Sequence, residues 1–337
     1  MSLNNNMLCK ERIFLTGGTG FFGRALLRHW SERASIGSEV PEVSVLSRDP
    51  DAFQQRYPEF RDLLWLRFCA GDIMEPVSLP EGEGYSHVLH AAADSTIGQQ
   101  LVPLRRYDQI VDGTRNLLEF ARRCGARRFL LTSSGGVYGP QPPGMERIAE
   151  SYCGMPDPLV PAYAYSVAKR AAEHLCALYQ DSYGIETVIA RCFAFVGEDL
   201  PLDAHFAIGN FIRDALAGAE IVIAGDGSPL RSYLDQRDLA VWLLTMLMKG
   251  KPGIAYNVGS DTPLSILSLA ELVRDILAPD SAVRVLGENI PGNFRSRYVP
   301  DTTRARVDLG LNVSVTLADA IRHTAMCARE RTVLYAY

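Results

Sequence analysis

A short apolar segment runs directly into a glycine-rich turn, and this junction limits the possible fold more than any other part of the sequence. A strand is expected at 12–16 and a helix at 22–33. The turn between them consists of Gly17, Gly18, Thr19, Gly20, Phe21, Phe22 and Gly23. Without Cβ atoms, the backbone of such a turn can approach a pyrophosphate at the N-terminus of the helix. The junction therefore predicts a dinucleotide-binding βαβ unit.

Apolar strand candidates alternate with amphipathic helical patterns through the first half of the chain. Further strands are expected at 42–46, 65–70, 87–91, 127–132 and 186–191, and further helices at 103–124 and 165–183. Strands and helices in this alternation form parallel sheets that are covered on both faces. The fold class predicted is α/β, with a doubly wound parallel sheet of the Rossmann type.

The pattern changes after about residue 196, where glycine and proline interrupt shorter segments. Helices expected at 234–248 and 265–277 predict a smaller C-terminal α+β lobe. At 337 residues the chain is long for a single core. We therefore assign 1–195 to a dinucleotide-binding domain that carries the catalytic residues and 196–337 to a substrate lobe, with room for the chain to cross back.

Composition and charge exclude several classes of partner. Apolar residues make up 47% and charged residues 22% of the chain, and a net charge of -5 leaves no basic face for nucleic acid. No apolar run reaches the roughly 18 residues of a membrane span, and the first residues lack the apolar core of a secretory signal. The seven cysteines are scattered without a C-x-x-C pair, which predicts reduced thiols, a cytoplasmic protein and no metal site.

The end of the second expected strand bears on the choice of dinucleotide. An acidic residue there binds the ribose 2′-hydroxyl of NAD, whereas an arginine suits the 2′-phosphate of NADP. Ser47 takes the place of the acid and Arg48 follows it, which favours NADP(H). Asp49 is close enough to leave NAD(H) open.

Residues at the ends of the third and fourth expected strands complete the predicted cofactor site. Small side chains at these strand ends let a flat cofactor lie across the edge of the sheet. The residues concerned are Asp72, Ile73, His90, Ala91 and Ala92. For His90 the alternative is a histidine packed in the core.

Tyr165 and Lys169 are four residues apart and share one face of an expected helix. A tyrosine with its ordinary pKa of about 10 is a poor base at neutral pH, but a neighbouring ammonium favours the phenolate. Tyr165 can then exchange a proton with a substrate hydroxyl or carbonyl while hydride moves to or from the nicotinamide. Ser134 follows the fifth expected strand, where its hydroxyl can hydrogen-bond the reacting oxygen.

The motifs GGTGFFG, GDI, HAAA, TSSGGVYG and YSVAK occur in this order, and together they resemble the extended short-chain dehydrogenase/reductase family. The resemblance covers nearly the whole chain. It implies an epimerase, dehydratase or 4-ketoreductase that acts on a nucleotide-diphosphate sugar, and a homodimer. It also implies that Ser134, Tyr165 and Lys169 are the catalytic residues and that Lys169 holds the nicotinamide ribose.

The resemblance continues into the second lobe and implies how the substrate is held. Asn210 and Phe211 match the family segment that contacts the nucleotide and diphosphate. Arg231 matches an arginine that binds the diphosphate, where a fork of donors suits phosphate oxygens. Arg295 or Arg297 is a candidate for a second such arginine.

Departures from the family pattern limit the reaction. Dehydratases of the family carry an Asp-Glu pair directly after the catalytic threonine, whereas this chain has Gly135 and Gly136, which cannot transfer protons. Dehydration is therefore not expected. Ile110 and Ala194 replace two asparagines, and the change at Ala194 suggests an atypical diphosphate site that involves His205. A simple loop residue is the alternative for His205.

These observations leave three hypotheses. The leading one is a 4-keto-sugar nucleotide reductase that consumes NADPH. The second is a nucleotide-sugar 4-epimerase that retains NAD and regenerates it in each turnover. A third, a catalytically silent cofactor-sensing protein, conflicts with the presence of Ser134, Tyr165 and Lys169.

Overall fold

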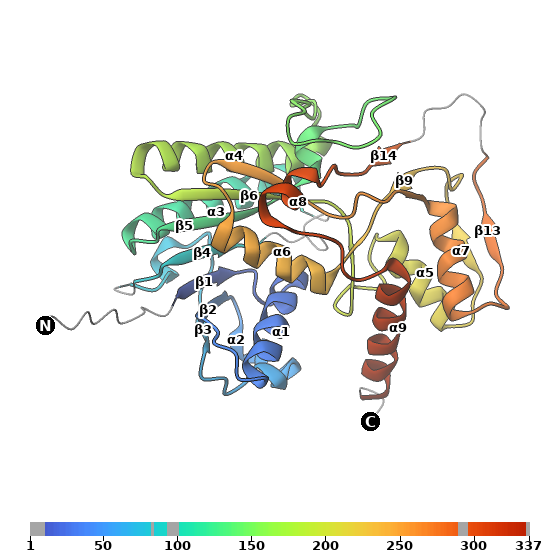
Figure 1. The fold of residues 1–337 in the computed structure, drawn as a ribbon, viewed down its shortest axis with the longest axis horizontal. Helices are drawn as coiled ribbons and strands as arrows, with labels where there is room; N and C mark the ends of the chain where they lie inside the picture. The colour runs from blue at the N-terminus through green and yellow to red at the C-terminus, as the bar shows by residue number, and fades with distance from the viewer. Residues whose placement is uncertain (1–10, 82–83, 93–100, 289–295, 335–337) are drawn as a thin grey trace, which may run out of the picture.

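The computed structural model describes residues 11–81, 84–92, 101–288 and 296–334, and a parallel sheet of seven strands lies at its centre (Figure 1). Every neighbouring pair of strands in this sheet is parallel. The spatial order is β3 (Leu66–Ala70), β2 (Glu42–Ser47), β1 (Arg12–Thr16), β4 (His87–His90), β5 (Arg128–Ser134), β6 (Glu186–Cys192) and β11 (Ile254–Val258). The order reverses between β1 and β4, which is where open α/β sheets bind their ligands.

Helices cover both faces of the sheet, as the sequence predicts (Figure 1). On one face α1 (Phe21–Ser35) packs on α6 (Gln236–Lys249), and on the other α3 (Pro103–Arg123) packs on α4 (Ala164–Tyr183). The short α2 (Pro50–Arg56) packs against β3. The expected strands and helices are all present, with bounds shifted by at most two residues. The predicted doubly wound α/β class is confirmed.

Strand β5 shows why a continuous apolar run suits the middle of this sheet. All seven of its residues are buried. Phe129 and Leu131 pack into the core beneath α3 and α4, whereas Leu130 packs into the core beneath α1 and α6. Side chains of a strand alternate between faces, so a strand between two helical layers must be apolar on both.

The second lobe has a core of its own. Helices α5 (Ala207–Leu216), α7 (Ile266–Leu277) and α9 (Leu317–Leu334) pack around β8 (Ile221–Ile223), which pairs with β13 (Val283–Val285). A small sheet orders β12 (Leu264–Ser265), β9 (Leu230–Arg231) and β14 (Arg297–Tyr298). Among the described residues, the remaining strands and α-helix are β7 (Phe195–Val196), β10 (Leu234–Asp235) and α8 (Thr303–Leu309).

The chain crosses back to the first domain after entering the second lobe. Helix α6 and strand β11 both lie beyond residue 195, yet α6 covers the central sheet and β11 pairs with β6 along Val188–Cys192. Asp235 begins α6 by accepting a hydrogen bond from the Arg237 N–H at 2.7 Å. A division at 195/196 therefore separates elements that share one sheet. Across the described residues no helix has the length and apolar character to cross a membrane.

Candidate active site

The glycine turn forms a cradle of bare backbone at the switch between β1 and β4. A Cβ on Gly17 (φ +74°) would lie 2.5 Å from the Ala91 carbonyl, and one on Gly23 would lie 2.2 Å from the Gly18 Cα. Packing within the protein therefore requires glycine at both positions. At Gly20 a Cβ would meet only the Gly17 oxygen, at 3.4 Å, so packing leaves this point open.

Gly20 is also the N-cap of α1, and no side chain caps this helix end. The first N–H groups of a helix lack intrahelical partners and carry partial positive charge. An open glycine next to uncapped N–H groups fits a dinucleotide pyrophosphate. The residues present thus fit the predicted cofactor, with Gly17–Gly23 at its phosphates and Ala91 and Ala92 packed over the turn.

The end of β2 offers one exposed cation. The Asp49 carboxylate accepts a hydrogen bond from the Ala52 N–H at 2.9 Å and caps α2, and Ser47 Oγ accepts the Asp49 N–H at 3.2 Å. The Arg48 side chain is exposed. Because Asp49 is engaged as a helix cap, Arg48 is the charged side chain that this loop presents.

The predicted residues after β3, Asp72 and Ile73, position the loop that borders the site. The Asp72 carboxylate accepts the Met74 N–H at 2.9 Å, and the Ile73 side chain packs against Gly113 of α3, where a Cβ would lie 2.7 Å from it. Those contacts hold the loop after β3 against α3.

His90 lies in the core rather than at the open edge. It is 2% exposed, and its Nδ1 lies 2.8 Å from the Thr16 Oγ1 while its Nε2 lies 3.3 Å from the Thr114 Oγ1. Burial, with a smaller contribution from the Lys169 charge, lowers the pKa of His90 to about 3. Its imidazole is therefore neutral at physiological pH, with both ring nitrogens already in contact with threonine hydroxyls.

The structure brings Ser134, Tyr165 and Lys169 together at the carboxyl end of β5. Tyr165 lies in the first turn of α4, close enough to Ser134, the last residue of β5, for that serine to lower its pKa. One turn later, the Lys169 Nζ donates to the Thr132 carbonyl at 2.8 Å. Tyr and Lys thus share a helix face directed at one strand end.

Burial changes the acidity of both groups. It lowers the pKa of Lys169, which is 2% exposed, to about 8. The pKa of Tyr165 is raised, chiefly by burial, while the Ser134 hydrogen bond and the charge of Arg106 act in the opposite direction. Lys169 therefore titrates close to neutral pH, and Tyr165 is protonated in the protein alone.

Strands β9 and β14 carry second-lobe residues to this strand end. Arg231 of β9 pairs directly with Tyr298 of β14. The Arg231 guanidinium donates to the Leu230 carbonyl at 2.8 Å and to the Ser296 carbonyl at 3.3 Å. Tyr298 is close enough to Ser134 for that serine to lower its pKa. Arg231 is thus linked to the Ser134 site through one neighbour.

The other predicted substrate residues take different positions. The ring of Phe211 is 4% exposed and belongs to the core of the second lobe, so its side chain is not available for a ligand contact. The Asn210 Oδ1 accepts a hydrogen bond from Arg213 at 3.3 Å. Arg295 lies outside the described residues, and the alternative Arg297 donates to the Glu146 carbonyl at 3.3 Å.

A sequence model of the NAD dependent epimerase/dehydratase family matches residues 13–259. The chain belongs to this family. The resemblance to the extended short-chain dehydrogenases/reductases is therefore confirmed.

The proteins to which this chain is similar in sequence and structure include sugar-nucleotide enzymes. A UDP-glucuronic acid decarboxylase of Arabidopsis thaliana, number 5, is 31% identical over 326 residues, which cover 95% of this chain and 90% of the relative. The structure of DesIV from Streptomyces venezuelae, a dTDP-glucose 4,6-dehydratase with NAD bound, aligns with a TM-score of 0.80 and 26% identity over 96% of this chain and 98% of that one. RMD of Pseudomonas aeruginosa, complexed with NADPH, aligns with a TM-score of 0.75 and 25% identity over 96% and 100% of the two chains.

Two residues near Ser134 and Tyr165, Arg106 and Tyr298, are not among the site residues that the sequence predicts. The Arg106 guanidinium of α3 lies over the Tyr165 ring, 4.3 Å from its centroid, and its charge also lowers the pKa of the exposed His205, after burial. The Tyr298 hydroxyl lies where a side chain at position 135 would be, 2.7 Å from the Cβ position of Gly135. The glycines at 135 and 136 could have indicated such a residue, because their missing side chains leave space for a side chain from another part of the chain.

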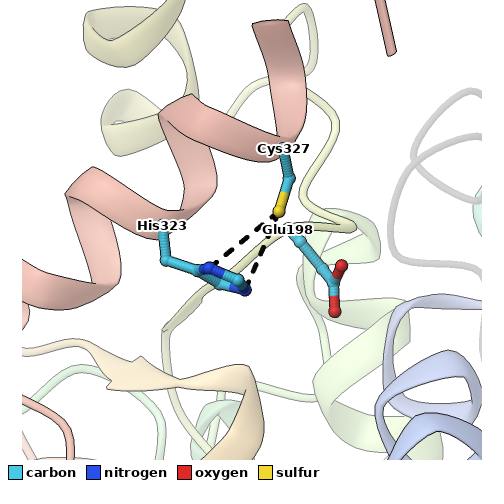
Figure 2. A group of neighbouring side chains, drawn as sticks. All are labelled: Glu198, His323 and Cys327. Atoms are coloured by element: carbon cyan, nitrogen blue, oxygen red, sulfur yellow. Dashed lines mark hydrogen bonds between the residues drawn. The ribbon is translucent and has the colours of Figure 1, made fainter. Parts of the chain in front are cut away.

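A cluster of possible metal ligands lies at α9, although the sequence predicts no metal site. Figure 2 shows Glu198, His323 and Cys327 side by side, with ligand atoms within 4.8 Å of one another. His323 and Cys327 are spaced i, i+4 on α9, which is the sequence pattern that could have indicated this cluster. Burial raises the pKa of Cys327 to about 11, and Arg28 of α1 pairs with Glu198 at 3.1 Å. The Glu198 carboxylate is thus already paired with a cationic side chain of α1.

Proposed function

We propose that this protein is an NAD(P)-dependent enzyme of nucleotide-diphosphate sugars, and specifically a 4-keto-sugar reductase that uses NADPH. One observation carries the proposal. Ser134, Tyr165 and Lys169 meet at the cofactor edge of the sheet, while the two positions after Ser134 are glycines. This set can protonate or deprotonate one oxygen, and it provides no acid or base for a neighbouring carbon.

The protein's own residues then have distinct tasks. When bound, the nicotinamide supplies or accepts the hydride. Tyr165 gives its proton to the carbonyl oxygen at C4, and Ser134 hydrogen-bonds the same oxygen. Lys169 lies one turn from Tyr165, where its positive charge stabilises the phenolate that remains. Protonation of a single oxygen completes a carbonyl reduction.

Elimination of water across a carbon–carbon bond needs more than this set. A base must remove a proton from carbon, and an acid must protonate the departing hydroxyl. Gly135 and Gly136 provide neither, and the Tyr298 phenol occupies the space next to Gly135. This supports chemistry confined to the C4 oxygen and argues against a 4,6-dehydratase.

A 4-epimerase is the second candidate, because the same Ser-Tyr-Lys set supports oxidation and reduction at C4. The end of β2 favours the reductase over the epimerase. Arg48 is exposed there and Asp49 is engaged as a helix cap, which suits the 2′-phosphate of NADP(H). If NAD(H) proves to be the tighter ligand, the epimerase gains support.

The cofactor that copurifies, followed by titration with NADPH and NADH, provides the first test. A 4-keto-6-deoxy sugar nucleotide is then supplied with NADPH, and UDP-glucose and UDP-glucuronic acid are supplied with NAD. Stoichiometric oxidation of NADPH supports the reductase, and interconversion of C4 epimers without net cofactor change supports the epimerase. Release of carbon dioxide from UDP-glucuronic acid would replace both with the activity named for the Arabidopsis relative. Cofactor binding without any turnover would favour the silent cofactor sensor.

Tyr165→Phe separates chemistry from binding in the same assay. We expect kcat to fall about 10²-fold or more, the scale of a lost acid/base group, with cofactor affinity nearly unchanged. Tyr183→Phe, on the exposed end of the same helix, is the matched control. A homodimer is also proposed, and light scattering of the purified protein at micromolar concentration tests it.

A further inference from the structure

Tyr298 reaches the Ser134 site from the second lobe, more than a hundred residues later in the chain. Its ring packs on Phe193 with the ring centroids 4.6 Å apart. The hydroxyl donates to the Cys192 carbonyl at 3.5 Å, and it is close enough to Ser134 for that serine to lower its pKa. It lies 2.7 Å from the Cβ position of Gly135, so this phenol fits only because residue 135 has no side chain.

The Ser134 hydroxyl has a limited number of hydrogen bonds to share. It accepts the Gly136 N–H at 3.1 Å, and the neighbouring hydroxyls of Tyr165 and Tyr298, whose pKa values it lowers, are the two groups left to share its proton and its second lone pair. A serine hydroxyl has one proton to donate and two lone pairs to accept with. Once Gly136 has taken one lone pair, Ser134 must donate to one tyrosine and accept from the other. The two tyrosines are therefore linked through the direction of a single hydroxyl.

We propose that Tyr298 is a positioning residue that donates to Ser134 and thereby turns the Ser134 proton toward the oxygen of Tyr165. The inference rests on the proposed function and adds a residue from the second lobe to its chemistry. While Tyr165 keeps its proton, the hydrogen bonds between these hydroxyls can point the other way, and Tyr298 then donates to the Cys192 carbonyl. When Tyr165 loses its proton, Tyr298 turns to Ser134, and Ser134 donates to the phenolate. A hydrogen bond to the charged form favours that form.

Other groups around Tyr165 act on the same phenol and must be kept constant in any test. Arg106 faces it from α3, Lys169 lies one turn along α4, and Cys192 lies on β6. Arg231 lies beyond Tyr298, and His90 lies beyond Lys169. The test substitution therefore removes one hydroxyl and no charge.

Tyr298→Phe is the test, because it keeps the packing on Phe193. We expect the pKa of Tyr165 to rise by about one unit, the scale of one lost hydrogen bond to a charged group. Nuclear magnetic resonance of isotope-labelled tyrosine in the protein alone and with NADP reads this pKa directly, and the signal is assigned by its absence in Tyr165→Phe. We expect kcat/KM to fall about tenfold at neutral pH. The deficit narrows as pH rises past the wild-type pKa of Tyr165.

Gly135→Ala provides a second variant that keeps the phenol. Its new Cβ would lie 2.7 Å from both the Tyr298 hydroxyl and the Phe193 ring, so it should displace the phenol and shift the pKa of Tyr165 in the same direction. Tyr256→Phe is the control, since Tyr256 is a buried tyrosine whose hydroxyl contacts Asp308 instead. An unchanged Tyr165 pKa in Tyr298→Phe, or the same loss of kcat/KM at every pH, would overturn the proposal. Failure of the proposed function is a different result, namely full activity in Tyr165→Phe.

Discussion

The Arg106 guanidinium lies 4.3 Å from the centroid of the Tyr165 ring, so α3 places a cation over the phenol that α4 carries. A cation at this distance attracts the aromatic face and stabilises a negative charge on its oxygen. Arg106→Met keeps an unbranched side chain and removes the charge. We expect the pKa of Tyr165 to rise and kcat/KM at neutral pH to fall by about tenfold, or about 1.4 kcal/mol.

The pH profile of kcat/KM checks this expectation. In the reductive direction Tyr165 must hold its proton, so the alkaline limb of the profile should move to higher pH in Arg106→Met. Arg105→Met removes the preceding, exposed arginine and should leave the profile in place. An equal shift in both variants would mean that general surface charge, and not the contact with the ring, sets the pKa of Tyr165.

The buried charge of Lys169 should lower the free energy of unfolding, although the proposed reaction needs this residue. Burial lowers its pKa from an ordinary value of 10.5 to about 8, so between these values the unfolded chain binds more protons and stability rises with pH. Below pH 8 the full cost is present, about 3 kcal/mol. Lys169→Met removes it and loses the hydrogen bond to Thr132, worth about 1 kcal/mol.

Urea unfolding of the cofactor-free protein tests the cost of Lys169. At pH 7 we expect Lys169→Met to be more stable than the wild type by about 2 kcal/mol and to lack turnover. The gain should disappear as pH rises through the window from 8 to 10.5. Lys249→Met, an exposed lysine at the end of α6, should show no such pH-dependent gain. A gain that is constant with pH would point to packing and not to the buried charge.

Arg48 should select the cofactor. Arg48→Ala removes a charge-assisted hydrogen bond to the 2′-phosphate, worth about 1.5–3 kcal/mol, which NAD(H) cannot make. We expect NADP(H) affinity to fall by the corresponding factor while NAD(H) affinity hardly changes, as measured by calorimetry. Arg33→Ala, at the far end of α1, controls for the loss of surface charge. Equal losses for both cofactors, or a wild-type preference for NAD(H), would remove the support for the reductase.

Arg231 should hold the diphosphate of the substrate. Arg231→Ala removes a fork of charge-assisted bonds, which should cost about 2–3 kcal/mol, or some 30- to 150-fold in affinity for a nucleoside diphosphate. The affinity for NADP(H) should stay nearly the same. Arg231→Lys keeps the charge and loses the fork, so it should recover only part of the affinity. If cofactor binding falls and diphosphate binding survives, the second lobe does not hold the substrate phosphates.

Local patterns explain which parts of the molecule the sequence could predict. The turn from Gly17 to Gly23 and the run Phe129–Leu130–Leu131 carry their structure in adjacent residues, so β1, α1 and β5 follow from the sequence. Strand β11 pairs with β6, which precedes it by the whole of α5 and α6, and no nearby pattern marks that partner.

The same reason applies to the candidate site. Tyr165 and Lys169 could be found because one helix carries both at a spacing of four. Arg106 and Tyr298 reach the same point from α3 and β14, and only the packed fold brings them there. Phe211 was placed by resemblance alone, and its ring is used by the core of the second lobe.

The return of the chain through α6 and β11 makes the two lobes a single cooperative unit. A fragment that ends at residue 195 would leave β6 as an edge strand with unpaired backbone groups, and it would lose Trp242 and Leu243 from the core over α1. The remaining piece would carry β11 without its partner β6, and α6 without the central sheet that it covers. Neither fragment is therefore an independent folding module, and heat or denaturant should unfold the substrate-binding part and the cofactor-binding part together.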